Sequence, residues 1–258
     1  MKKSHKNTVL AVGGSALTMT LLTACPPAPP PYASTTLDFR FPDTAQSAAQ
    51  SADLTLAAIY FVDGSSSQQN ADVQVLTTGD LTRDGNFSYP GGPNAGGTVN
   101  GGTLRLDSFA LEPLRKNAAC LTSFKTGEAR GLDNVVVTPE TARTCNVYFT
   151  LFRDASGNRK PESGEELFTT HDIYSYADTA FAYSFSSTDG KSVENGRRAA
   201  GWSLVRHEVL QPSATPGQYR VTMNSVPAAD EGLVIRLHED TDRLISMGLN
   251  NLDRGGLK

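Results

Sequence analysis

Short segments in which apolar and polar residues alternate with a period of two are the feature that most constrains this chain. In residues 178–186, Phe181, Tyr183 and Phe185 alternate with alanine and serine. Side chains of a β-strand point alternately to its two faces, so this period predicts a strand with one buried face. Other segments predicted to form strands are residues 37–41, 54–62, 73–75, 104–106, 135–137, 145–152, 202–210 and 219–226.

Turn-forming residues separate these segments at intervals of roughly 8 to 15 residues, which is typical of antiparallel sheets. We therefore expect an all-β fold, an antiparallel β-sandwich-like arrangement of about ten strands. The fold is either one large module or two small ones in tandem, and in the second case the division lies near residues 112–132. The Phe181–Tyr183–Phe185 face is expected to pack against a second sheet together with Trp202, although exposed aromatic rings also stack on sugars or peptides.

Two segments depart from the strand pattern. Residues 91–102 contain six glycines among twelve residues, and we expect a long flexible loop there. No Gly-Lys-Ser/Thr follows it, so it lacks the pattern of a phosphate loop. Near the C-terminus, Leu233, Ile235 and Leu237 fit a strand, whereas a helical face also fits residues 233–247. We favour a hairpin with its turn at residues 240–242.

The first 24 residues have the three parts of an export signal, namely a basic start, an apolar stretch and small residues at its end. The apolar stretch, Val9–Leu22, is shorter than the about 20 apolar residues that span a bilayer. Leu22-Thr23-Ala24-Cys25 follows and resembles the lipobox of bacterial lipoproteins. This resemblance implies that Cys25 receives a diacylglyceryl group and becomes the new N-terminus.

The prolines at residues 26–31 favour polyproline II and predict a semi-rigid tether. The expected organisation is a signal peptide at 1–24, a lipidated cysteine and tether at 25–35, and a β-rich extracytoplasmic region at 36–258. Two or three acyl chains hold a protein at a membrane without an inserted segment. The expected location is the cell envelope, on the periplasmic side or the outer surface.

With Cys25 assigned to lipid, Cys120 and Cys145 remain as one possible pair in an oxidising compartment. Two free or metal-binding thiols are the alternative. Loss of residues 1–24 removes three lysines and no acid, which leaves 20 basic against 27 acidic residues, a formal charge of −7. A surface of this charge repels phosphate backbones, so nucleic acid is not an expected partner.

Residues 154–165 resemble an EF-hand-type calcium loop. Oxygen ligands alternate along such a loop and end in a bidentate glutamate at its twelfth position. Arg159 stands where the sharp turn favours glycine, and a polar hairpin loop is the alternative interpretation. The candidate calcium ligands are Asp154, Ser156, Asn158, the Lys160 carbonyl and Glu165.

Histidine is scarce beyond the signal segment: only His171, His207 and His238 remain. His207-Glu208 and His238-Glu239 each lack the second histidine of a His-Glu-x-x-His zinc helix, so we assign no metal to them. The Gly-x-Ser-x-Gly and Ser-x-x-Lys motifs of hydrolases are absent after the signal segment. A concave pocket that gathers these histidines with carboxylates would indicate an enzyme.

These patterns favour a lipid-anchored β module of the cell envelope without catalytic activity. Its partners are the membrane, through the lipid, and a protein or cell-wall component. An extracytoplasmic surface enzyme or a ligand-binding lipoprotein is the alternative. A two-lobed solute-binding protein would show alternating strands and helices, which this chain lacks.

Overall fold

Strands make up most of the structure. The computed structural model describes residues 34–42, 54–62, 72–84, 98–162, 165–210, 218–227 and 232–239. The strands are β1 (Ser34–Arg40), β2 (Leu54–Val62), β3 (Asp72–Thr78), β4 (Asp80–Asp84), β5 (Thr98–Asp107), β6 (Thr122–Ser123), β7 (Asp133–Thr138), β8 (Arg143–Arg153), β9 (Glu166–Thr169), β10 (Ile173–Ala177), β11 (Phe181–Ser186), β12 (Ser192–Arg198), β13 (Gly201–Leu210), β14 (Tyr219–Ser225), β15 (Ile235–Arg236) and β16 (His238–Glu239). Two short helices are described, α2 (Ser108–Leu111) and the 3-10 helix η1 (Leu114–Lys116).

Strand β8 is the longest strand and the centre of the larger sheet. Its eleven residues are rich in β-branched and aromatic side chains, which favour extended structure. The nine residues between its ends, 144–152, are all buried. Both faces of β8 are therefore covered by other parts of the chain.

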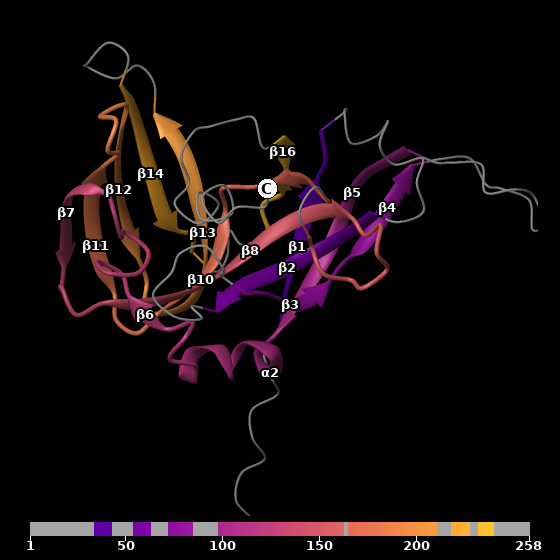
Figure 1. Cartoon of the computed structure of the whole chain (residues 1–258), viewed down its shortest axis with the longest axis horizontal. Coiled ribbons are helices and arrows are strands. Elements are labelled where there is room, and N and C mark those ends of the chain that lie inside the picture. Colours follow the sequence, from indigo (N-terminus) through magenta and orange to yellow (C-terminus); the bar gives the residue numbers. More distant parts are fainter. Residues whose placement is uncertain are drawn as a thin grey trace, which may run out of the picture. The chain divides into compact units, whose positions relative to one another are not determined.

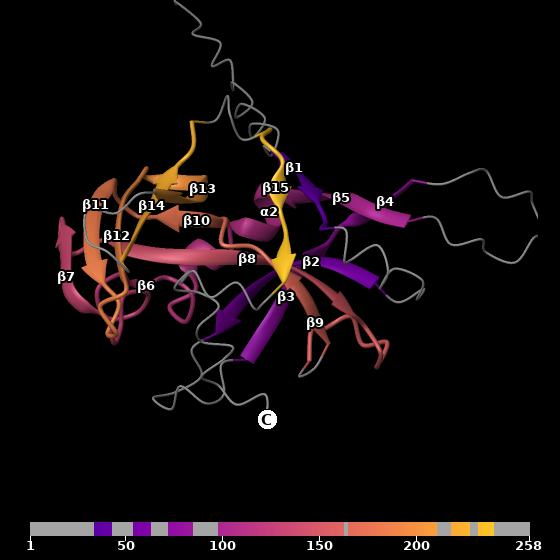
Figure 2. The same cartoon turned by 90° about the horizontal axis from the view of Figure 1, so that it is seen from above.

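Four strands pair with β8, two along each edge. Along one edge, β10 pairs with residues 144–147 and β9 with residues 150–152. Along the other edge, β6 pairs with residues 143–144 and β2 with residues 148–153. Figures 1 and 2 both show β8 running from the β6 and β10 region toward β2. All four pairings are antiparallel.

The two sheets confirm the predicted all-β, sandwich-like fold. The larger sheet has the order β16-β9-β8-β10-β13-β14-β12-β11-β7, with β2, β3 and β6 joined through the second edge of β8. The smaller sheet has the order β15-β1-β5-β4. Most neighbouring strands are antiparallel, and the pairs β1–β15 and β12–β14 are parallel.

The smaller sheet packs on one face of β8 through a shared hydrophobic cluster, the inter-sheet core. Phe39 of β1 contacts Phe149 of β8 edge to face, with ring centroids 5.2 Å apart. Val147, Phe149 and Leu151 line one face of β8, as the alternation in the sequence predicts. The buried members of the inter-sheet core are Leu37, Phe39, Phe41, Leu54, Leu56, Ala58, Val99, Leu104, Leu106, Leu111, Leu114, Cys120, Cys145, Val147, Phe149, Leu151, Phe168, Tyr174, Leu204, Ile235 and Leu237.

A second core lies on the opposite face of the larger sheet. Phe181, Tyr183 and Phe185 of β11 are buried in it, as predicted. Phe124, in the segment that follows β6, packs against Phe181 and Tyr183 with ring centroids 5.0 and 4.5 Å away. A loop residue and the sheet itself therefore enclose this aromatic face. Trp202 was expected in the same cluster, and this was wrong: it is partly buried, stacks on Tyr174 and packs against the inter-sheet core.

The glycine-rich segment is only partly a loop. Residues 91–97 lie outside the described residues, but β5 begins at Thr98 and includes Gly101 and Gly102. A Cβ on Gly101 would come within 2.5 Å of the Phe39 carbonyl oxygen, and one on Gly102 within 2.7 Å of the Asp80 carbonyl oxygen. These glycines are needed because the neighbouring strands approach β5 closely, so the prediction of a loop through residue 102 was wrong.

The C-terminal segment is extended where the structure describes it. Ile235 and Leu237 are buried in the inter-sheet core, as the strand interpretation predicts. Leu233, in contrast, is half exposed. Strand β15 pairs in parallel with β1, and β16 pairs with β9. The predicted turn at residues 240–242 lies outside the described residues.

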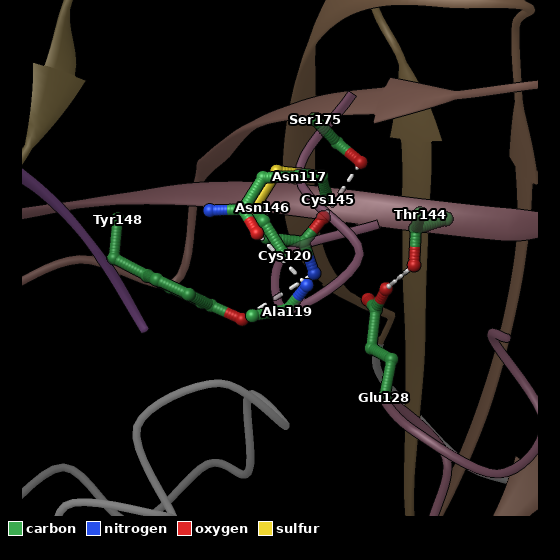
Figure 3. Close-up of a disulfide and its surroundings, with 9 residues drawn as sticks. All are labelled: Asn117, Ala119, Cys120, Glu128, Thr144, Cys145, Asn146, Tyr148 and Ser175. Carbon is green, nitrogen blue, oxygen red and sulfur yellow. Dashed lines mark hydrogen bonds between the residues drawn. A yellow bond between two sulfur atoms is a disulfide. The ribbon is translucent and has the colours of Figure 1, made fainter. Parts of the chain in front are cut away.

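A disulfide joins Cys120 to Cys145 of β8, as predicted. The Cα atoms are 4.9 Å apart, and both residues belong to the inter-sheet core. Figure 3 shows the bridge beside Asn146, whose side-chain carbonyl accepts a hydrogen bond of 2.7 Å from the Ser175 hydroxyl. The bridge ties the segment that follows η1 to the N-terminal half of β8.

We predict that replacing Cys120 and Cys145 together by alanine lowers the free energy of unfolding by about 3.5 kcal/mol. The bridge closes a chain segment with a sequence separation of 25, and its loss frees that segment in the unfolded state. Urea denaturation of the wild type and the double variant measures the difference. Dithiothreitol should lower the stability of the wild type and leave the variant unchanged. A difference below about 1 kcal/mol would show that packing alone holds this segment.

Candidate functional site

The three histidines that follow the signal segment come together. His171 lies between β9 and β10, His207 on β13 and His238 on β16. The ring centroid of His171 is 4.6 Å from that of His207 and 4.4 Å from that of His238. All three side chains are partly buried and partly accessible to solvent. We call these three residues the histidine cluster.

A bulge in the larger sheet positions His171. The register pairs Thr169 with Thr150 and Tyr174 with Val147, so the four residues 170–173 lie opposite only residues 148–149 of β8. The segment between β9 and β10 therefore carries two more residues than its partner. Bulges of this kind interrupt the ladder and redirect side chains, and they often occur beside functional sites.

An ion pair fixes the segments that carry the cluster. Arg206, which precedes His207, lies with its Nη2 3.1 Å from the Oδ2 of Asp172, the residue after His171. The Asp172 Oδ1 also accepts the His207 backbone N–H at 2.9 Å. Arg206 Nη2 donates to the Val234 carbonyl at 2.9 Å, close to the segment that leads to His238. Arg206 thus links all three segments.

The surroundings keep His171 uncharged. Burial, followed by the nearby His207 and His238, lowers the pKa of His171 from 6.5 to about 3. A neutral imidazole retains one nitrogen lone pair, which accepts a hydrogen bond or binds a metal. Burial raises the pKa of the neighbouring Asp172 carboxyl, an effect opposed by the His207 amide and by Arg206.

Hydrogen bonds assign the tautomers within the cluster. The His238 Nδ1 lies 2.9 Å from the Glu239 carbonyl oxygen. Because a carbonyl only accepts, Nδ1 carries the proton, and the lone pair of a neutral His238 is on Nε2. That Nε2 lies 3.0 Å from the His171 Nδ1. His171 therefore donates its Nδ1–H to His238.

No local motif predicts that these three histidines meet. Long stretches of chain separate its members, and strand pairing alone brings them together. In the described part of the chain, no group of three or more His, Cys, Asp or Glu side chains could hold a metal ion. The Asp172 carboxylate faces Arg206 and the His207 backbone amide.

The predicted calcium loop is folded around its own backbone amides. Asp154 Oδ2 accepts the Arg159 N–H at 2.9 Å, and Asn158 Oδ1 accepts the Lys160 N–H at 2.7 Å. The Ser156 hydroxyl oxygen accepts the Asn158 N–H at 3.4 Å. The candidate side chains of the first half of the loop are thus close together.

Glu165 closes the loop from its other end. This residue is only 8% exposed. Its Oε1 accepts the N–H groups of Ala155 and Ser156 at 3.0 and 3.3 Å, and its Oε2 accepts that of Glu162 at 3.0 Å. Calcium would have to share these oxygens with the amides, and calcium binding here stays a prediction.

At its sixth position, the loop has the backbone conformation that an EF-hand-type calcium loop requires. Arg159, the sixth residue of the loop, has a φ of 59°, and Gly157 has a φ of 73°. The sharp turn that favours glycine at the sixth position is therefore present although arginine occupies it. The left-handed conformation costs a residue with a side chain about 1 to 2 kcal/mol.

The second core also contains a buried charge network, which no pattern in the sequence predicted. Arg198 Nη2 lies 2.8 Å from Glu128 Oε1, and both side chains are almost fully buried. Tyr183 donates its hydroxyl proton to Glu194 Oε1 at 2.7 Å. Burial raises the pKa of Glu194 from 4.5 to about 8, which keeps this carboxyl protonated at neutral pH. Arg198 and Glu128 thus form the charged pair of the network.

Comparisons with known proteins do not assign the chain to a family. No protein-family model, curated protein or solved structure matches the chain. Among the residues that the structure describes, no helix has the length and apolar character needed to cross a membrane. Cys25 lies outside the described residues, so its lipidation stays a prediction.

We predict that Arg159→Gly stabilises the protein by about 0.5 to 1 kcal/mol. Glycine adopts the left-handed conformation without steric cost, and its greater freedom in the unfolded chain offsets part of the gain. The substitution also removes a positive charge beside Asp154, so calcium should bind the variant more tightly than the wild type. Urea denaturation and calorimetric titration with calcium measure the two effects.

Gly157→Ala is the matched control, because it places a side chain in the other left-handed residue of the loop. It should lower the free energy of unfolding by about 1 kcal/mol. Absence of heat and of any change in melting temperature at millimolar calcium, for both the wild type and Arg159→Gly, would rule out calcium at this loop.

Proposed function

We propose that this chain is a lipid-anchored module of the cell envelope that serves a structural or partner-binding role without catalysis. The observation that carries the proposal is the disulfide between Cys120 and Cys145. Disulfides form and persist in oxidising compartments, which indicates an extracytoplasmic location. The bridge also uses two of the three cysteines and leaves Cys25 as the acceptor for lipid.

The N-terminal sequence supports the anchor. A basic and then apolar leader precedes Leu22–Cys25, and prolines follow directly. A tether of this composition holds the β module away from the lipid surface. The acidic balance expected after removal of the leader disfavours nucleic acid and leaves a protein or cell-wall component as the partner.

The histidine cluster favours a second candidate, a ligand-binding lipoprotein. Three imidazole rings that are each partly exposed lie together there and present a polar surface to a ligand. This candidate shares the anchor and the location with the first and differs only in what the β module binds.

We predict that a bacterial host incorporates labelled palmitate into the wild-type chain and that Cys25→Ser abolishes the label. The reason is that the lipid would be attached through the Cys25 thiol. Electrophoresis of the immunoprecipitated protein, followed by detection of the label, makes the measurement. Membrane and aqueous fractions separated with detergent should show the same difference.

The Cys120→Ala/Cys145→Ala double variant is the control, because it removes the other two thiols and should keep the label. An unlabelled wild type, or equal label in Cys25→Ser, would contradict lipidation at Cys25. Label lost only in the double variant would place the lipid on a different cysteine and contradict the disulfide assignment as well.

A further inference from the structure

We propose that the larger sheet binds a glycan on an aromatic surface made by Tyr174, Tyr176 and Trp202, which we call the aromatic platform. The rings stack on the apolar C–H face of a pyranose unit, and charged side chains at the border of the platform bond its hydroxyl groups. The inference rests on the proposed partner-binding role and narrows the partner to a carbohydrate.

Strand register brings the three aromatic side chains to one face of the larger sheet. Tyr176 of β10 lies opposite Trp202 of β13 and, along its other edge, opposite Cys145 of β8. Tyr174 is two residues before Tyr176 and therefore points to the same face. This face carries the inter-sheet core, to which Tyr174 belongs. The aromatic platform thus continues that core toward the N-terminal end of β8.

Trp202 is the central ring of the aromatic platform. It stacks on Tyr174 with centroids 5.7 Å apart and planes 6° from parallel, and it meets Tyr176 at 5.5 Å and 55°. Tyr174 is buried, whereas Tyr176 and Trp202 are each partly exposed. The buried ring fixes the orientation of its neighbours, so the exposed aromatic surface is formed before a ligand arrives. Such preorganisation reduces the cost of binding.

One ion pair borders the aromatic platform at the end of β10. Asp178 lies two residues after Tyr176 and Arg143 two residues before Cys145, so both side chains share the face of the platform. Arg143 Nε donates to Asp178 Oδ2 at 2.7 Å, and Asp178 Oδ1 accepts the Arg143 backbone N–H at 3.0 Å. The Arg143 side chain is 54% exposed. A guanidinium carries further N–H donors, which can bond a sugar hydroxyl.

A second charged group borders the aromatic platform from the short helices that follow β5. Glu112 accepts hydrogen bonds from Arg115, and its Oε1 lies 3.0 Å from Lys116 Nζ. The pKa of Arg115 is raised, first by the hydrogen bond to Glu112 and also by the Tyr176 hydroxyl, so this guanidinium lies beside the platform. All three charged side chains are exposed to solvent.

The chemistry of this surface matches a sugar better than a peptide. A pyranose ring has an apolar face, which packs on an aromatic ring, and an edge of hydroxyl groups that both donate and accept hydrogen bonds. Each charged border places guanidinium donors next to carboxylate acceptors, so it can serve both functions of a hydroxyl. Proline-rich peptides also dock on aromatic rings, but their apolar proline faces have no use for a charged border.

The test is titration of the full chain, in a detergent without sugar groups, with chitohexaose, cellohexaose and maltohexaose. Trp202 is the only tryptophan of the chain, so tryptophan fluorescence reports directly on the aromatic platform. We expect at least one sugar to shift the emission and to give a matching affinity in calorimetry. That affinity should fall about tenfold in Trp202→Ala, whereas Trp202→Phe should keep most of it because an aromatic ring remains.

Two variants separate binding from folding. Arg143→Gln leaves every ring in place and should weaken binding about fivefold, because a charged hydrogen-bond donor is lost. Lys125→Gln is the matched control: it breaks an exposed ion pair with Glu140, of 3.1 Å, next to Phe124 of the second core. It should bind the sugar as the wild type does. Far-ultraviolet circular dichroism confirms that each variant is folded.

Three results would overturn the proposal. The first is no fluorescence change and no heat with any of the three sugars at concentrations up to about 10 mM. The second is equal affinity in the wild type and Trp202→Ala. The third is a response to hexaproline, titrated in parallel, without a response to any sugar. None of them bears on lipidation of Cys25, so failure of the glycan site is distinguishable from failure of the proposed anchor.

Discussion

Burial of β8 on both faces is the constraint on which the rest of this structure depends. A strand covered on both sides and paired on both edges requires partners from many parts of the chain. The apolar side chains of β8 contribute to two separate cores. Its polar side chains need hydrogen bonds, because a buried polar group without a partner costs about 1 to 3 kcal/mol.

The polar residues of β8 have these partners. Thr144 donates to Glu128 at 2.7 Å, and Thr150 donates to the Phe168 carbonyl at 3.2 Å. Asn146 accepts from Ser175 and donates to the Tyr148 hydroxyl. Figure 3 shows three of these interactions around the disulfide. Glu128 also pairs with Arg198, so the hydrogen bonds of β8 continue into the buried charge network.

The same strand creates the histidine cluster. Because β9 and β10 follow one another along a single edge of β8, the extra residues between them form the bulge that carries His171. Strand β13 then pairs with β10, and β16 with β9, which brings His207 and His238 to the same place. The cluster is thus a consequence of the sheet order.

Local patterns explain which parts of the fold could be predicted from the sequence. Alternation identified the buried faces of β8 and β11, and the cysteine count identified the disulfide, because both depend on neighbouring residues or composition. Gly101 and Gly102 were assigned to a loop because the sequence does not show which backbones approach them. The histidine cluster and the Arg198–Glu128 pair depend on strand order, which has no local signature.

Native-state hydrogen exchange along β8 tests most directly whether this strand unites the module. If it does, amides 144–147, beside β10, and amides 150–152, beside β9, should exchange last and with the same free energy of opening. Their exchange should also show the same dependence on denaturant, since both halves open only in global unfolding. Distinct free energies of opening for the two halves would contradict this account and indicate two modules that unfold independently.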